Sequence, residues 1–151
     1  MPLARGLARA AKTFGLGKRP LAGFSRKPVQ LQAFAGNPLT SDRKRWDRDA
    51  ATLTAHPELG TGAPTYSWLC ATLDSVDELQ KWPTDQGPSC PTLIAMAGLD
   101  RVVNNTGTKN FLERAPGFSS LTIADSQHEI LNEKPEIRER FLAAFEAFIN
   151  G

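Results

Sequence analysis

Two ionisable side chains, Asp100 and His128, follow two short apolar segments in the second half of the 151-residue chain. Asp100 comes just after PTLIAMAG, residues 91–98, and His128 comes just after SLTIAD, residues 120–125. In an Asp-His pair, the carboxylate fixes the imidazole tautomer and stabilises the imidazolium that forms when the histidine takes a proton. The two residues could therefore supply general-base chemistry, provided that the fold brings their loops together.

Each of these residues also has an ordinary structural explanation. Asp100 alone could be a turn residue or a helix cap, because aspartate is a common turn former. A single loop histidine is more often solvated than catalytic. Their joint placement after two apolar segments is what favours an Asp-His pair. The two cysteines and two histidines match no zinc-binding spacing, so we expect no metal and no other cofactor.

Hydrophobic patterning predicts the elements that must position the pair. Residues 91–98 and 120–125 are typical of strands buried on both faces, residues 104–114 can form a helix, and residues 135–150 carry one apolar helical face. This β-α-β-α order predicts two parallel strands with a right-handed crossover, so both loops leave the same sheet edge. Parallel sheets normally have more strands, and we expect the edge of a larger α/β fold.

The first part of the chain has helical rather than strand-like patterns. We expect helices over 3–14, 40–55 and 64–82, with Pro64 in a first-turn position, and a loop rich in glycine and proline over 15–39. Seven basic residues and no acidic one precede Asp42. Such a start fits either a mitochondrial targeting segment or a short surface helix, and the absence of serine before Ser25 favours the helix.

Composition excludes several classes of protein. With 40% hydrophobic and 23% charged residues, the chain is neither disordered nor fibrous, and it has no apolar run of the roughly 18–20 residues that a spanning helix needs. A net charge of +2 does not indicate a nucleic-acid partner. The start of the sequence has no apolar segment of the kind found in secretory signals, so we expect no such signal and a cytoplasmic location.

Two motifs make the likeness to a known family specific. GLDRVV, residues 98–103, and SQHEIL, residues 126–131, lie in a tail that resembles the C-terminal end of α/β-hydrolases of the lysophospholipase and monoacylglycerol-lipase branch, also grouped as serine-aminopeptidase-like. Residues 34–49 and 62–69 resemble the lid region of the bacterial lysophospholipases in that branch.

This resemblance implies that the chain is the C-terminal part of an α/β-hydrolase fold, with residues 1–82 as a helical lid and 83–151 as the β-α-β-α part of the core. Asp100 then resembles the triad acid and His128 the triad base. The family's serine lies in a Gly-x-Ser-x-Gly elbow upstream of the lid. The nearest string, residues 23–27, lacks the second glycine, so we expect that the N-terminal half of the fold is missing.

The resemblance also bears on substrate. It implies that Tyr66, Trp68 and Leu69 line a path for an acyl chain, although these side chains could equally pack the lid onto the sheet. A monoacyl lipid or another small ester is the expected substrate, with a possible contact between the lid and a membrane surface. The alternative is a non-catalytic remnant that binds a lipid or a partner.

Two acidic residues lie beside the histidine, Glu129 and Glu133. We expect them to fix the loop rather than to catalyse, and Glu133 could pair with Arg138 at the start of the last helix.

Overall fold

The computed structural model describes residues 2–151, with side chains described from residue 5 onward, and these residues form two compact units. The first unit combines the N-terminal residues up to Gln32 with Leu53–Trp82. The second combines Ala33–Thr52 with Pro83–Gly151. Residues 33–52, which fall within the expected lid, thus belong to the same compact unit as the C-terminal strands.

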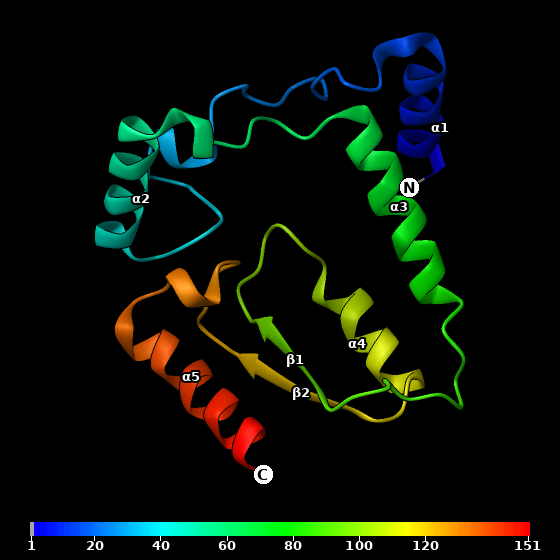
Figure 1. The fold of residues 1–151 in the computed structure, drawn as a ribbon, viewed down its shortest axis with the longest axis vertical. Coiled ribbons are helices and arrows are strands. Elements are labelled where there is room, and N and C mark those ends of the chain that lie inside the picture. Colours follow the sequence, from blue (N-terminus) through cyan, green and yellow to red (C-terminus); the bar gives the residue numbers. More distant parts are fainter. Residues whose placement is uncertain (1) are drawn as a thin grey trace. The chain divides into compact units, whose positions relative to one another are not determined.

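Helix α1 (Pro2–Ala11) and helix α3 (Tyr66–Gln80) lie side by side in the first unit (Figure 1). Arg5 forms an ion pair with Asp77, and Arg9 Nη2 lies 3.0 Å from an Asp74 carboxylate oxygen. Two carboxylates of α3 therefore neutralise part of the positive charge at the start of the chain. Hydrogen bonding from Arg5 holds the pKa of the Asp77 carboxyl below its usual value.

The ends of these two helices follow from local chemistry. After α1, a short π-helical segment, η1 (Lys12–Leu16), bends at Gly15, which has a φ of 76° that glycine tolerates. Thr65 caps α3, because its side chain accepts a hydrogen bond from the Trp68 N–H. The expected first-turn position of Pro64 is therefore wrong: Pro64 precedes the cap. Two 3₁₀ turns, η2 (Val29–Leu31) and η3 (Pro57–Leu59), complete this part.

Helix α2 (Arg43–Ala55) starts in the second unit. Asp42 caps its first turn by accepting hydrogen bonds from the N–H groups of Lys44 and Arg45, at 2.8 and 3.1 Å. Trp46 is its buried anchor and meets the Phe34 ring edge-on, with the ring centroids 5.8 Å apart. Trp46 is thus the side chain through which this polar helix packs, since it is the buried residue of α2.

The second unit contains the expected β-α-β-α order: β1 (Thr92–Ala97), α4 (Asn105–Arg114), β2 (Phe118–Ile123) and α5 (Pro135–Asn150), with a 3₁₀ turn, η4 (Ile130–Asn132), before α5. The strands are parallel, with Thr92 opposite Phe118 and Ala97 opposite Ile123. Strand β2 starts two residues earlier than the pattern predicts. Because the strands are parallel, their carboxyl ends, and the loops that follow them, meet at one sheet edge (Figure 1).

The hydrophobic core of the second unit is small. Its buried apolar side chains include Met96 and Ala97 on β1, Ile123 on β2 and Ile137 on α5. In the sheet described, each strand has only one hydrogen-bonded neighbour. No helix among residues 2–151 combines the length and the apolar character needed to cross a bilayer.

Candidate active site

Asp100 and His128 form a direct hydrogen bond at the carboxyl ends of the two strands. His128 Nδ1 lies 2.8 Å from Asp100 Oδ2. The Asp100 side chain is only 4% exposed, whereas the His128 side chain is 33% exposed. The expected proximity of the two residues is confirmed, and the pair has its carboxylate buried and its imidazole open on one side.

The second oxygen of Asp100 is held by its own loop. Oδ1 accepts hydrogen bonds from the N–H groups of Val102 and Val103, at 2.8 and 3.0 Å. Burial raises the pKa of this carboxyl, but the hydrogen bonds from His128, Val103 and Val102 outweigh burial, and the net pKa lies below the usual value. An ionised Asp100 accepts a hydrogen bond from His128 Nδ1–H, and this tautomer leaves the lone pair of the imidazole on Nε2.

The acid and base loops are joined by backbone as well as by side chains. The Gly98 N–H donates to the Ile123 carbonyl and the Leu99 N–H donates to the Ser126 carbonyl, both at 2.8 Å. These bonds continue the pairing of the strands beyond their ends. The role of Gly98 was missed in the sequence, although a glycine directly after a strand is a signal for close backbone approach.

A segment far away in the sequence also holds both loops, and we call residues 36–42 the strap. The His128 N–H donates to the Pro38 carbonyl at 3.5 Å, and the Glu129 N–H donates to the Leu39 carbonyl at 2.8 Å. On the acid side, Arg101 Nη2 donates to the Asn37 carbonyl at 2.7 Å. The strap therefore connects the neighbour of Asp100 to the loop of His128.

The buried side chain of Asn37 fixes the conformation of the strap, because both the oxygen and the nitrogen of its amide form hydrogen bonds with nearby backbone. Its Oδ1 accepts from the N–H groups of Leu39 and Thr40, at 2.9 and 3.0 Å, and its Nδ2 donates to the carbonyls of Phe34 and Thr40, at 2.9 and 3.1 Å. Sequence reasoning missed this residue. The available signal was the Asn-Pro pair, which favours a turn of this kind.

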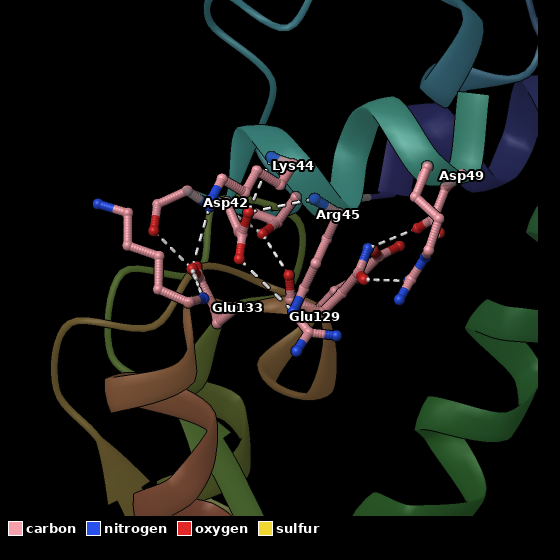
Figure 2. A network of polar contacts seen from close by, with 11 residues as sticks. Asp42, Lys44, Arg45, Asp49, Glu129 and Glu133 are labelled. Carbon is pink, nitrogen blue, oxygen red and sulfur yellow. Dashed lines mark hydrogen bonds and ion pairs between the residues drawn. The ribbon is translucent and has the colours of Figure 1, made fainter. Parts of the chain in front are cut away.

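Glu133 is fully buried and lies against the strap (Figure 2). Its carboxylate accepts from both the N–H and the hydroxyl of Ser41, at 3.1 and 2.5 Å, and from the Gln127 N–H at 2.8 Å. The expected pair with Arg138 is therefore wrong, because the oxygens of Glu133 are taken by donors from the strap and from the residue before His128.

Glu129 belongs to a second cluster, which connects η4 to α2 (Figure 2). Asn132 Nδ2 donates to Glu129 Oε2 at 3.0 Å and to Asp49 Oδ2 at 2.7 Å. Arg48 Nη2 donates to Asn132 Oδ1 at 3.1 Å. As expected for a loop-fixing group, Glu129 is bound within the loop that carries His128.

Beside His128 the surface is concave and mostly apolar. An open hollow of about 460 Å³ is lined by the histidine, by Ala95 of β1, by Phe141 of α5 and by residues 129–132. Apolar groups next to an imidazole can exclude water from a reacting bond. Within residues 2–151, no three His, Cys, Asp or Glu side chains are grouped so that they could hold a metal ion.

The residues expected to line an acyl path, Tyr66, Trp68 and Leu69, all lie in the first turn of α3. They belong to the other compact unit from Asp100 and His128. Trp68 is 56% exposed, whereas Tyr66 and Leu69 are half-buried. The exposed indole offers apolar surface, and a role for these side chains in substrate binding stays a prediction.

Comparison with known proteins agrees with this arrangement. The sequence pattern of the family described as serine aminopeptidase, S33, matches residues 3–135. The chain is 32% identical to lysophospholipase L2 of Escherichia coli K12 over 124 residues, which cover 78% of this chain and 36% of that protein. It is 26% identical to the probable lysophospholipase L2 of Haemophilus influenzae over 95 residues, 63% of this chain and 30% of that protein.

The fold also resembles a solved structure, a soluble variant of the monoglyceride lipase of Saccharomyces cerevisiae in complex with a substrate analogue. The TM-score is 0.65 at 12% sequence identity, and the match covers 97% of this chain and 48% of the lipase chain. The two strands and the surrounding helices are thus part of an α/β-hydrolase fold. The chain spans about a third of the length of the curated relatives that it matches.

Proposed function

The chain belongs to the serine aminopeptidase S33 family, and from this premise we propose that it falls in the lysophospholipase and monoglyceride-lipase-like branch, with Asp100 and His128 as the acid and base of a serine hydrolase triad. The reaction is the hydrolysis of a carboxylic ester in a lipid with a single acyl chain. The 2.8 Å hydrogen bond between His128 Nδ1 and Asp100 Oδ2 is the observation that carries the proposal.

In this reaction, His128 Nε2 takes the proton of a serine hydroxyl while the serine oxygen attacks the ester carbonyl. The imidazolium that forms keeps its Nδ1–H on the ionised Asp100 carboxylate. The proton then passes from Nε2 to the alcohol that leaves, and the acyl group stays on the serine. A water molecule, deprotonated by the same nitrogen, releases the fatty acid and restores the serine.

The serine and the oxyanion-hole donors come, in this proposal, from residues outside the 151 described by the sequence. The chain contains no Gly-x-Ser-x-Gly string, and its match extends over only 36% of the E. coli relative. Ser126, the serine nearest to His128 in the sequence, is fully buried, and its hydroxyl donates a hydrogen bond to the Gln127 carbonyl at 2.7 Å. The chain alone is therefore expected to lack esterase activity.

The substrate class follows from the relatives and from the expected lid. The matching proteins are named as lysophospholipases and as a monoglyceride lipase. We propose that this chain likewise acts on monoacyl lipids, with residues 1–82 as the lid. Tyr66, Trp68 and Leu69 would then lie along the acyl chain of the substrate. Their apolar and aromatic surface suits a fatty acyl group.

A chimera provides the test. The matched 124-residue region of the E. coli lysophospholipase L2 is replaced by the corresponding residues of this chain, and release of fatty acid from a lysophospholipid and from a monoglyceride is measured. We expect the chimera to hydrolyse at least one of them and His128→Ala to lower kcat/KM by on the order of 10³-fold or more. The 151-residue chain alone should not hydrolyse a short-chain p-nitrophenyl ester.

His56→Ala is the matched control, because His56 is exposed and pairs with Glu58 of its own turn, at 3.1 Å, away from Asp100 and His128 in the sequence. The chimera with His56→Ala should hydrolyse both lipids as fast as the unchanged chimera does. A chimera that melts cooperatively yet hydrolyses neither lipid would contradict the proposal and favour a non-catalytic remnant. So would esterase turnover by the 151-residue chain that is unaffected by His128→Ala.

A contact with a lipid surface is a second proposed function, favoured by the segment 12–19. Phe14 is 81% exposed and Leu16 is 45% exposed, and the exposed basic side chains Lys12, Lys18 and Arg19 flank them. Apolar side chains among basic ones suit the boundary of an anionic membrane, where the apolar groups enter the interface and the cations meet the headgroups.

Co-sedimentation with vesicles tests this contact. We expect the chain to bind vesicles that contain phosphatidylglycerol better than vesicles of phosphatidylcholine alone, and high salt to weaken binding. Phe14→Ser should reduce binding several-fold, whereas Ile149→Ser, which removes another exposed apolar side chain from α5, should not. Equal binding to both vesicle types, or equal loss in both variants, would contradict a specific contact at this segment.

A further inference from the structure

Glu133 is fully buried, yet it belongs neither to the Asp100-His128 pair nor to any salt bridge found in the described part of the chain. A carboxylate removed from water is strongly unfavourable unless hydrogen bonds replace its hydration. The hydrogen-bond partners of Glu133 therefore show which parts of the chain its buried carboxylate connects.

Four donors surround the carboxylate. Oε2 accepts from the Ser41 N–H and hydroxyl, at 3.1 and 2.5 Å, and from the Lys134 N–H at 3.3 Å. Oε1 accepts from the Gln127 N–H at 2.8 Å. An ionised carboxylate only accepts hydrogen bonds, and all four partners donate, so the side chain is satisfied in its charged form. Moving any of these partners leaves a buried charge with less compensation.

One of these partners directly precedes the histidine. The next two N–H groups along the loop, of His128 and Glu129, donate to carbonyls of the strap, and Ser41 belongs to the same strap. Three successive N–H groups are thus hydrogen-bonded, the first to Glu133 and the next two to the strap. Glu133 also binds the strap itself, through Ser41.

We propose that Glu133 is a positioning residue for His128: it holds the backbone at Gln127 against the strap and so directs Nδ1 of the imidazole onto Asp100. It touches neither the substrate nor the imidazole. The catalytic consequence rests on the proposed function, whereas the effect on the geometry of His128 does not.

The direct test is Glu133→Gln, which keeps the shape of the side chain but turns one acceptor into an N–H donor. The new amide N–H then points at a group that is itself a donor, either the Gln127 N–H or the Ser41 N–H and hydroxyl. The chain has two histidines, so selective ¹⁵N labelling of histidine gives an NMR spectrum with two imidazoles. We expect the Nδ1–H signal of His128 to lose its downfield shift, and the Gln127 N–H to exchange with solvent about tenfold faster or more.

Thr65→Ala is the control for a purely structural effect. It removes the cap of α3, which belongs to the other compact unit, and Thr65 lies outside the strap. We expect it to lower the melting temperature and to leave the His128 signal unchanged. If Glu133→Gln is folded and also leaves both the His128 signal and the Gln127 exchange unchanged, the positioning role is overturned.

Ser41→Ala provides a second variant in case Glu133→Gln does not fold. It removes the 2.5 Å bond to Oε2 and leaves the carboxylate in place. A smaller change of the same sign in both signals is expected, and no change in either would overturn the proposal. In the chimera, Glu133→Gln should lower kcat about tenfold or more with little change in KM. A chimera that is inactive before mutation would instead count against the proposed function, while the NMR result still decides the role of Glu133.

Discussion

Gly98 and Ala124 approach each other so closely that no side chain fits between them. A Cβ atom on Gly98 would lie 2.2 Å from the carbonyl oxygen of Ala124 and 2.6 Å from its carbonyl carbon. Both residues directly follow their strands, two residues before Asp100 and four residues before His128. The close approach of these two backbones is therefore a condition for the hydrogen bond between the acid and the base.

Gly98→Ala should accordingly push the two strand ends apart. Because the clash is with backbone, which cannot rotate away, we expect a loss of about 1–3 kcal/mol of unfolding free energy and a weaker Asp100-His128 bond. Urea denaturation and the His128 Nδ1–H signal measure the two effects. Gly107→Ala is the matched control: nothing lies within 4 Å of its added Cβ, and in α4 alanine should stabilise by about 0.5–1 kcal/mol. Equal stability changes for the two variants would contradict the argument.

Asp100→Asn should leave the shape of the site almost unchanged and remove its function. An amide offers an N–H where the carboxylate offered a lone pair, so the imidazole no longer keeps its proton on Nδ1. In an active chimera we expect kcat to fall on the order of 10³–10⁴-fold, by analogy with other triads. Asp125→Asn is the control, since Asp125 also follows β2 but pairs with Arg140 on the surface. Loss of activity in both variants alike would argue against a special role for Asp100.

The lowered pKa of Asp100 predicts the direction of one contribution to acid stability. The folded value lies below the unfolded value of about 3.9. Ionised Asp100 therefore stabilises the fold at pH values above about 4, and this contribution disappears as the pH falls through the lowered folded value. The unfolding free energy of Asp100→Asn should depend less steeply on pH between about 5 and 2 than that of the unchanged chain. Identical slopes in urea denaturation series would contradict this.

The exposed sheet edges predict association of the chain on its own. Strands β1 and β2 pair only with each other in the described sheet, and Phe145 and Ile149 of α5 are exposed. Open edges and apolar side chains of this kind promote pairing between molecules. Light scattering should detect oligomers or a loosely packed state, and co-expression with the N-terminal part of the E. coli relative should reduce them. A compact monomer with one sharp melting transition would contradict the prediction.

Local patterns in the sequence were sufficient for the order of elements in the second unit. Apolar runs and a proline at the start of α5 are signals that act over a few residues, so β1, α4, β2 and α5 were predicted close to their observed bounds. The placement of Asp100 and His128 at one sheet edge followed from the same order, because parallel strands present their carboxyl ends together. The motifs around these residues, GLDRVV and SQHEIL, were sufficient to indicate the family.

Tertiary structure alone decided how the histidine loop is held. Glu133 and Ser41 are 92 residues apart in the sequence, and neither residue's neighbours indicate that a carboxylate is buried against a strap. Local reasoning assigned Glu133 to Arg138 because only nearby partners can be seen in a linear pattern. The pairing of buried polar groups depends on which distant donors the folded chain brings together, since each such group must find its partners wherever the fold supplies them.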